Sequence, residues 1–381
     1  MITRRRFLAL AASSGGALFV PQITFAAAET DRRFVFVIQR GAADGLHIVA
    51  PYAEPEYANL RGPIASEIDN ATKLDASFAL HPALVETAKM YKAGEALFVH
   101  AVATAYRDRS HFDGQNVLET GGRAPYELKD GWMNRLTALL PKRKAAPIAL
   151  APTVPMALRG PAETTSYAPS ALPEPNDDLL ARVGLLYQRD PLLHPLWSAA
   201  IETRNMATKD ERGQDPAALG KLAATFLARA NGPRIAMIET SGWDTHTHQV
   251  ARLARLLAGF DAMLAAMRDG LGQSWAKTTV LVATEFGRTA AENGSGGTDH
   301  GTAAVVMLIG GAVKGGRIIA DWPGLSQSAL YENRDLKPTM ALDALIAGAA
   351  GETLSIDPDL VMRTIFKEGT GAKPITGLIR S

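Results

Sequence analysis

The sequence predicts an α/β protein with a mostly parallel β-sheet and helices on both of its faces. Short, continuous apolar runs rich in Val, Ile and Leu, such as residues 278–283 and 303–309, are typical of buried strands. Longer segments with Leu, Phe and Met at helical spacing, such as residues 249–271, lie between such runs. Strands that alternate with helices indicate a mostly parallel sheet covered on both faces.

Further elements can be assigned in order along the chain. Residues 82–91 are predicted to be helical because Pro82 suits a first helical turn and Gly94 ends the pattern. The helix at residues 111–118 is expected to begin after Ser110, a favoured N-cap residue. The remaining predicted strands are residues 33–38, 96–102, 147–150 and 234–238, and the remaining predicted helices are residues 131–140, 177–187, 196–206, 216–230, 339–350 and 359–366.

Residues 151–175 differ from the rest of the chain in being rich in Pro, Ser and Thr, which is typical of a long loop. Together with the helices predicted after it, this segment forms a helical and loop insertion in the middle of the chain. It contains few candidate catalytic groups. We therefore interpret residues 151–230 as a peripheral or cap insertion in one α/β domain of residues 29–381.

The composition excludes several classes of protein. The 40 Lys and Arg residues nearly balance the 39 Asp and Glu residues, so the chain lacks the basic excess of nucleic-acid-binding proteins. We therefore expect no nucleic-acid partner. The absence of Cys excludes disulfides, thiolate zinc sites and Cys nucleophiles.

Residues 1–28 have the pattern of an export signal. Consecutive arginines at positions 4–6 precede Phe7 and Leu8, and a mildly apolar run and an Ala-rich stretch follow, as in a twin-arginine signal. The alternatives are a retained membrane anchor or a basic tail, but the apolar run is shorter than the ~20 residues that span a bilayer. The sequence thus predicts export by the twin-arginine translocase, a periplasmic or secreted location, and no stable membrane span in the mature chain.

Candidate functional residues follow the predicted strands, or in one case precede the last of them. Because the carboxyl ends of parallel strands meet at one edge of a sheet, these side chains are expected to gather there. They are Asp44, Arg109, Ser110, His111, Asp244, His248, Glu285, Arg288 and His300.

Asp244 and His248 are four residues apart, a spacing that can bring a carboxylate and an imidazole to one point on a helical turn. Zinc and related divalent ions accept such nitrogen and oxygen ligands, and His300 is the natural third ligand. By itself the pair could equally be a helix-cap carboxylate and a surface His. The sequence predicts one or two divalent ions, with zinc, manganese and magnesium as the candidates.

Five motifs together are more specific than any single residue. They are Gly-Ala-Ala-Asp-Gly-Leu at 41–46, Arg-Ser-His-Phe at 109–112, Gly-Trp-Asp-Thr-His at 242–246, Thr-Glu-Phe-Gly-Arg-Thr at 284–289 and Gly-Thr-Asp-His-Gly at 297–301. In this combination the chain resembles a domain family of unknown function, DUF1501. That family is similar to a branch of the alkaline phosphatase and sulfatase superfamily, and the resemblance implies an alkaline-phosphatase-like fold.

The resemblance also implies roles for individual residues. Asp44 and Glu285 would ligate one metal ion, and Ser110 would be the nucleophile. Superfamily members with two metal ions usually follow the acid with His, whereas Phe286 follows Glu285 here. The first site therefore has one ligand fewer, unless His111, Asp113 or Asp299 substitutes. The second metal ion would be held by Asp244, His248 and His300.

Together these features predict an exported, metal-dependent hydrolase or transferase that acts on a phosphate or sulfate ester through Ser110. The metal ions and Arg109 or Arg288 would bind ester oxygens, and His111 would act as acid or base. Phe286 motivates an alternative, a non-catalytic exported binding or assembly protein on the same fold. A third interpretation is a structural metal site that holds residues 284–301.

Overall fold

The computed structural model describes residues 31–141, 146–168, 177–191, 193–206 and 215–380. The predicted export signal at residues 1–28 lies outside the described residues. Within the part of the chain that is described, no helix is both long enough and apolar enough to cross a membrane.

A nine-stranded sheet runs through the middle of the molecule in the order β11-β5-β10-β9-β1-β8-β6-β7, with β12 paired to β5. Every neighbouring pair is parallel except the two made by β10, which is antiparallel to β9 and to β5. The predicted fold class, a mostly parallel sheet, is confirmed. The strands are β1 (Arg33–Arg40), β5 (Ala96–Ala103), β6 (Ile148–Leu150), β7 (Thr165–Ser166), β8 (Ile235–Ser241), β9 (Thr278–Ala283), β10 (Ala304–Ile309), β11 (Arg317–Ile319) and β12 (Met340–Ala341).

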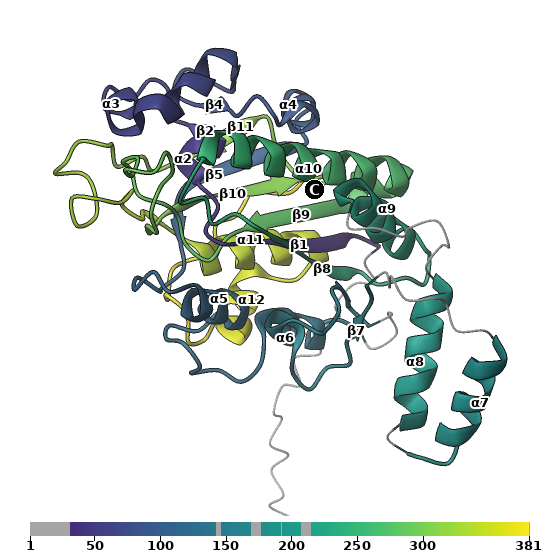
Figure 1. Ribbon diagram of the computed structural model, residues 1–381. Coiled ribbons are helices and arrows are strands. Elements are labelled where there is room, and N and C mark those ends of the chain that lie inside the picture. Colours follow the sequence, from purple (N-terminus) through teal and green to yellow (C-terminus); the bar gives the residue numbers. More distant parts are fainter. Residues whose placement is uncertain (1–30, 142–145, 169–176, 192, 207–214, 381) are drawn as a thin grey trace, which may run out of the picture.

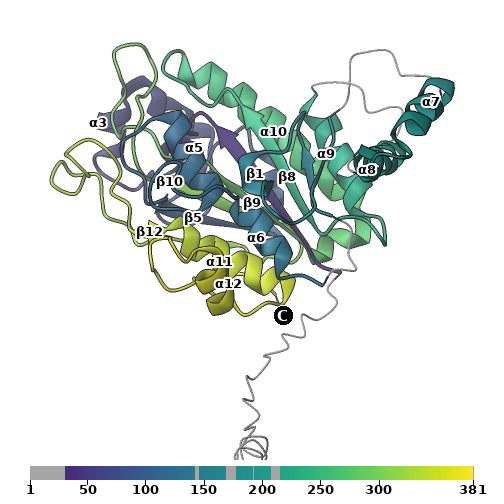
Figure 2. The same cartoon turned by 90° about the horizontal axis from the view of Figure 1, so that it is seen from below.

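Alternate residues of each strand enter different cores, because successive side chains of a strand point to opposite faces. Phe34 and Phe36 of β1 pack in the core beneath α5 (His111–Thr120), α6 (Trp132–Ala138), α11 (Leu342–Leu354) and α12 (Pro358–Ile365). Val35 and Val37 pack in the core beneath α4 (Val85–Lys92), α9 (Pro216–Leu227) and α10 (Gln249–Leu271). Figures 1 and 2 show these helices as layers on the two faces of the sheet. The prediction of helices on both faces is therefore also confirmed.

The middle of the chain, residues 151–230, divides into two parts. The helix α9 packs along α10 and contributes Leu222 and Phe226 to the core on that face. The helices α7 (Asp177–Tyr187) and α8 (Leu193–Met206) pair with each other, and the rings of Tyr187 and Trp197 meet edge to face at 5.8 Å. In both views this pair projects from the body of the molecule and lies well apart from α5.

After β1 the chain builds a small layer before it returns to the main sheet. It consists of α2 (Gly45–Ile48), α3 (Tyr57–Arg61), the 3-10 helix η1 (Gly62–Asn70) and a sheet in the order β2-β4-β3. The strands of this sheet are β2 (Val49–Ala50), β3 (Thr72–Lys73) and β4 (Ala79–Leu80).

A buried ion pair between Asp44 and Arg61 connects this layer to the main sheet and its helices. The side chains of Asp44 and Arg61 are fully buried and bonded to each other. Asp44 also caps α2 and accepts a hydrogen bond from Gln249 Nε2 on α10 at 2.6 Å, while Arg61 donates to the backbone oxygen of Thr289 at 3.2 Å. Burial by itself raises the pKa of Asp44, but the charge and hydrogen bond of Arg61 outweigh it and hold that pKa below its ordinary value. The carboxylate is therefore ionised, and its oxygens bind groups that hold the layer in place.

We expect Arg61→Met to lower the free energy of unfolding by roughly 3–5 kcal/mol, because it leaves the Asp44 carboxylate buried without its partner. Urea denaturation of the purified chain measures this change. Lys277→Met is the control, since Lys277 and Asp31 form an exposed pair, 55% and 54% accessible, and its loss should cost less than about 1 kcal/mol. Equal effects of the two substitutions would contradict a structural role for the buried pair.

Candidate metal centre

The candidate residues meet at one edge of the sheet, beyond the carboxyl ends of β5, β8 and β9. The segment before β10 joins them there because β10 is antiparallel, so its first residue lies at the same edge as the last residues of its neighbours. Tight backbone contacts shape this segment, since Gly287 and Gly301 lie too close to neighbouring backbone to accept a Cβ atom. Opposite each other in this segment, Arg288 and His300 form an isolated antiparallel bridge.

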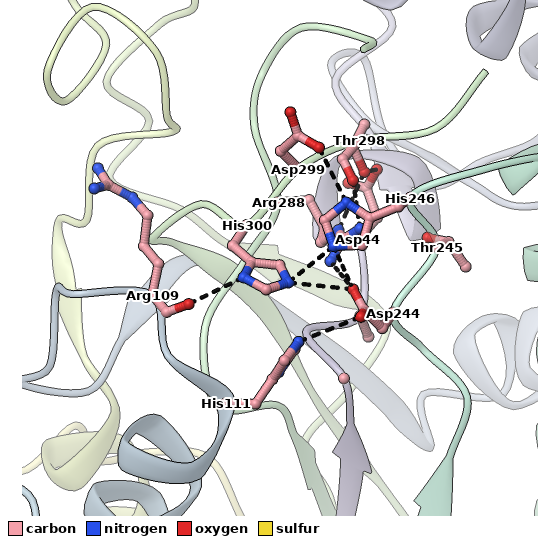
Figure 3. A network of polar contacts seen from close by, with 12 residues as sticks. Asp44, Arg109, His111, Asp244, Thr245, His246, Arg288, Thr298, Asp299 and His300 are labelled. Atoms are coloured by element: carbon pink, nitrogen blue, oxygen red, sulfur yellow. Dashed lines mark hydrogen bonds and ion pairs between the residues drawn. The ribbon is translucent and has the colours of Figure 1, made fainter. Parts of the chain in front are cut away.

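The carboxylate of Asp244, three residues after β8, is the point on which the other side chains converge (Figure 3). Its Oδ1 atom lies 2.6 Å from Nη1 of Arg288, 3.0 Å from Nε2 of His246 and 3.3 Å from Nε2 of His300. Its Oδ2 atom lies 3.5 Å from Nε2 of His111. The Nε2 atoms of His246 and His300 are themselves 3.0 Å apart. Three imidazoles and one carboxylate thus face a common point.

The opposite nitrogen, Nδ1, of each imidazole is held by an oxygen that can only accept a hydrogen bond. Each Nδ1 must therefore carry a hydrogen, so in the neutral ring the lone pair is on Nε2, the atom that faces Asp244. An outer oxygen that fixes the ring in this way is typical of metal-binding histidines. The partners are Glu285 Oε1 for His111 at 2.8 Å, Asp299 Oδ1 for His246 at 3.0 Å, and the backbone oxygen of Arg109 for His300 at 3.0 Å.

The charges around the cluster shift its pKa values in different directions. The hydrogen bond to Glu285 raises the pKa of His111, whereas burial, assisted by the charges of His111 and Arg288, lowers the pKa of His300. Burial opposes ionisation of Asp244, but the hydrogen bond and charge of Arg288 outweigh it, so the pKa of Asp244 lies below its ordinary value. The cluster therefore contains an ionised carboxylate and, at His300, an imidazole that favours its neutral, ligating form.

The arrangement fits a divalent metal ion. The Nε2 atom of His111 is buried and makes no hydrogen bond within the described residues, although it faces the cluster. Ligand atoms of His111, Asp244 and His300 lie within 4.8 Å of one another. A tetrahedral ion with bonds of about 2 Å holds its ligands roughly 3.3 Å apart, close to the separations of 3.0–3.3 Å among Asp244 Oδ1 and the Nε2 atoms of His246 and His300. Nitrogen and oxygen donors of this kind suit zinc and manganese.

The guanidinium groups of Arg109 and Arg288, which were predicted to bind ester oxygens, are both bonded to other groups of the protein. Arg288 is buried, and besides Asp244 it donates to Oγ1 and the backbone oxygen of Thr298. The guanidinium of Arg109 extends away from His300 and bonds to Asp335 and Glu332, so that only the Arg109 backbone oxygen reaches the cluster (Figure 3). Both arginines orient other groups of the cluster.

Glu285 and Phe286 lie behind the imidazoles. Glu285 is 1% exposed, and its Oε1 atom accepts hydrogen bonds from Nδ1 of His111, Nε2 of Gln115 and the N–H of Gly41. It therefore orients His111, and its oxygens do not face the point where the imidazoles meet. The ring of Phe286 stacks on His111 at 5.1 Å and lies 5.3 Å from His300. An apolar ring thus covers one side of these two imidazoles.

Besides Glu285, two further predicted ligands lie outside the ligand set. Asp44 is enclosed beside Arg61 in the buried pair, so its oxygens are already bonded. His248 is exposed and precedes α10 with a left-handed backbone, at φ 50°. The spacing argument for His248 required a helical turn from residue 244, whereas the helix begins only at Gln249. His246 takes the expected place, and the motif at residues 242–246 already contained it.

Ser110 is the N-cap of α5 and directly precedes His111. Its backbone is extended, at φ −93° and ψ 127°, as is usual for this position, but its hydroxyl makes no capping hydrogen bond. The hydroxyl is therefore not committed to the helix. The positive end of the helix lies beside it.

Three solved structures resemble the fold at low sequence identity. The C-terminal periplasmic domain of EcEptC from Escherichia coli, solved in complex with Zn, is 9% identical over 75% of this chain and 74% of that chain, with a TM-score of 0.35. Ps i-CgsB in complex with k-i-k-neocarrahexaose is 10% identical over 76% and 68%, with a TM-score of 0.38. Phosphonate monoester hydrolase of Agrobacterium radiobacter is 11% identical over 76% and 70%, with a TM-score of 0.30. These likenesses are too distant to indicate the chemistry of this chain.

No curated protein matches the sequence. The family described as "Protein of unknown function (DUF1501)" matches residues 31–366, as the five motifs predicted. Because this match extends over most of the chain, the protein belongs to the DUF1501 family.

Proposed function

We propose that this protein is an exported, metal-dependent hydrolase or transferase of phosphate or sulfate esters. The observation that carries the proposal is the convergence of three Nε2 atoms on Asp244, with each Nδ1 atom fixed from behind. The proposed ligands are His111, Asp244, His246 and His300. A divalent ion bound there would have to take an ester oxygen as a fifth ligand, which it would polarise while stabilising the charge that develops on it.

The chain itself supplies the nucleophile in this proposal. The oxygen of Ser110 attacks the phosphorus or sulfur atom while its proton passes to solvent, and the bond to the ester oxygen breaks. Water or a second alcohol then takes the group from Ser110, which regains a proton. His111 is assigned to the ligand set, so it no longer serves as acid or base. The side chains of Asp244 and His246 are 41% and 39% exposed, so the departing alcohol can take its proton from solvent.

The charges near the centre favour a singly charged substrate. Three guanidinium groups near the centre are paired with carboxylates: Arg40 with Glu119 and Glu239, Arg109 with Asp335 and Glu332, and Arg288 with Asp244. Apart from the charge of the metal ion itself, these groups leave little positive charge to bind a doubly charged phosphate monoester. A phosphodiester or a sulfate monoester carries a single charge, and we propose that one of these is the substrate.

We expect the purified chain to bind one zinc or manganese ion, and His246→Ala or His300→Ala to lose it. His248→Ala is the matched control: it removes an exposed imidazole two residues beyond His246 and should keep the ion. Metal content is measured by atomic emission after incubation with each ion and desalting. Loss of the ion in His248→Ala but not in His246→Ala would reject this ligand set.

We expect Ser110→Ala to retain the metal ion but to lose turnover of aryl phosphodiesters or aryl sulfates, because it removes the hydroxyl without touching a ligand. Chromogenic substrates measure the rate with added zinc, manganese and magnesium. The wild type should prefer these singly charged esters to an aryl phosphate monoester by about tenfold or more in kcat/KM, equivalent to roughly 1.4 kcal/mol.

Unchanged turnover in Ser110→Ala would reject Ser110 as the nucleophile, and a preference for the monoester would reject the charge argument. Binding of a metal ion without turnover of any ester would favour the non-catalytic binding or assembly protein, which Phe286 also motivates. Loss of stability on chelation, again without turnover, would favour a structural metal site.

Export rests on the arginines at positions 4–6 and the apolar run that follows them. We expect an Arg4→Lys, Arg5→Lys double variant of the full chain to remain in the cytoplasm, whereas the wild type reaches the periplasm or the medium. Cell fractionation and immunoblotting measure the location. Equal export of both forms would exclude the twin-arginine translocase as the partner.

A further inference from the structure

A tight turn at residues 331–335 lies behind the candidate metal centre. Tyr331 and Asp335 exchange backbone hydrogen bonds at 2.8 and 3.0 Å. Glu332 and Asn333 between them both have positive φ angles, 53° and 54°, which is the pattern of a type I′ turn. A backbone bridge to Thr289 ties the turn to the segment between β9 and β10.

The turn makes side-chain bonds to both segments that carry the centre. The side chain of Asp335 is fully buried, and its Oδ2 atom lies 2.8 Å from Nε and 2.8 Å from Nη2 of Arg109. On the other side, Nη2 of Arg334 donates to the backbone oxygen of His300 at 2.8 Å. The turn thus links the residue before Ser110 to a proposed ligand.

The bond between Asp335 and Arg109 bears on His300 through the backbone. Arg109 has a φ of 62°, a left-handed conformation that a residue with a Cβ atom adopts only when its surroundings hold it there. In this conformation its backbone oxygen accepts the hydrogen of Nδ1 of His300 at 3.0 Å. That hydrogen bond decides which nitrogen of His300 has the free lone pair.

We propose that Asp335 is a positioning residue of the metal centre, acting through Arg109 on His300. This inference rests on the proposed metal site. The buried carboxylate bonds to the guanidinium of Arg109 and so holds the backbone oxygen of Arg109 in the orientation in which it accepts a hydrogen bond from His300. Loss of such an outer partner typically costs 10- to 100-fold in metal affinity. Because Asp335 acts through one intermediate residue, an effect near the lower end of that range follows.

The test compares Asp335→Ala, Asp335→Asn and Glu332→Gln in the full mature chain. Glu332 is the matched control, since it also contacts Arg109 but its side chain is 55% exposed. Affinity for zinc is measured by competition with a chromogenic chelator, and the ligand geometry by the visible absorption spectrum of the cobalt-substituted protein. We expect Asp335→Ala to weaken zinc binding about tenfold and to alter the cobalt spectrum. Asp335→Asn, which keeps one acceptor oxygen, should fall between Asp335→Ala and the wild type, and Glu332→Gln should match the wild type.

Wild-type affinity and an unchanged cobalt spectrum in a folded Asp335→Ala variant would overturn the inference, even if the melting temperature without metal falls. If Asp335→Ala does not fold, Asp335→Asn and Arg109→Lys decide the question. Arg109→Lys keeps the backbone oxygen and the charge but loses the two-point bond to Asp335, so wild-type affinity and spectrum in both variants would also overturn it. If the wild type binds neither zinc nor cobalt, the metal centre itself is rejected, a result distinct from equal affinity in all variants.

Discussion

The candidate centre depends on the antiparallel insertion of one strand, β10, between β5 and β9. In a sheet with only parallel strands, the residues just before a strand lie at the amino edge of the sheet. The residues just after its neighbours lie at the opposite, carboxyl edge. Because β10 runs the other way, the segment before it returns to the carboxyl edge, and His300 meets Asp244 there. The glycines at 287 and 301 make this return compact, since a side chain at either position would collide with backbone.

The outer partners of the imidazoles come from different parts of the fold. Glu285 follows β9, Asp299 lies in the segment before β10, and Arg109 precedes α5. Each fixes one ring before any ion arrives, which reduces the reorganisation that binding would require. The arrangement gathers several carboxylates at one edge, and arginines balance them: Arg288 beside Asp244, and Arg109 beside Asp335. These arginines are consequently engaged within the protein, and the proposed preference for singly charged esters follows from that engagement.

Much of the fold could be predicted from the sequence. The apolar runs at 278–283 and 303–309 correspond closely to β9 and β10, and the amphipathic pattern at 249–271 coincides with α10. Such patterns are local in the sequence, because a strand or helix that buries one face must have apolar residues at the period of that element. The direction of β10 was not predictable in this way, because an apolar strand has the same composition whether its neighbours run parallel or antiparallel.

Which residues form the site could be predicted in part. Their positions beside predicted strands brought Asp244, His300 and His111 into consideration, and the structure places all three together. The four-residue spacing from Asp244 pointed to His248 because it presumed a helical turn, whereas residues 244–247 precede the helix and His246 faces the cluster. The family resemblance implied a metal ligand at Asp44, whereas the folded chain pairs Asp44 with Arg61. Nothing in the sequence around Asp44 indicates this partner, because Arg61 reaches Asp44 only when the small layer folds.

By itself the sequence determined the family, the alternating strands and helices, and the kind of donor atoms collected at the ends of the strands. These depend on periodicity, composition and short motifs, all of which are properties of neighbouring residues. Only the tertiary structure decided which imidazole faces Asp244, that Glu285 lies behind His111, and that Arg109 and Arg288 are bonded within the protein. Those outcomes depend on the direction of each side chain and on charges contributed by distant segments, which become neighbours only when the sheet assembles.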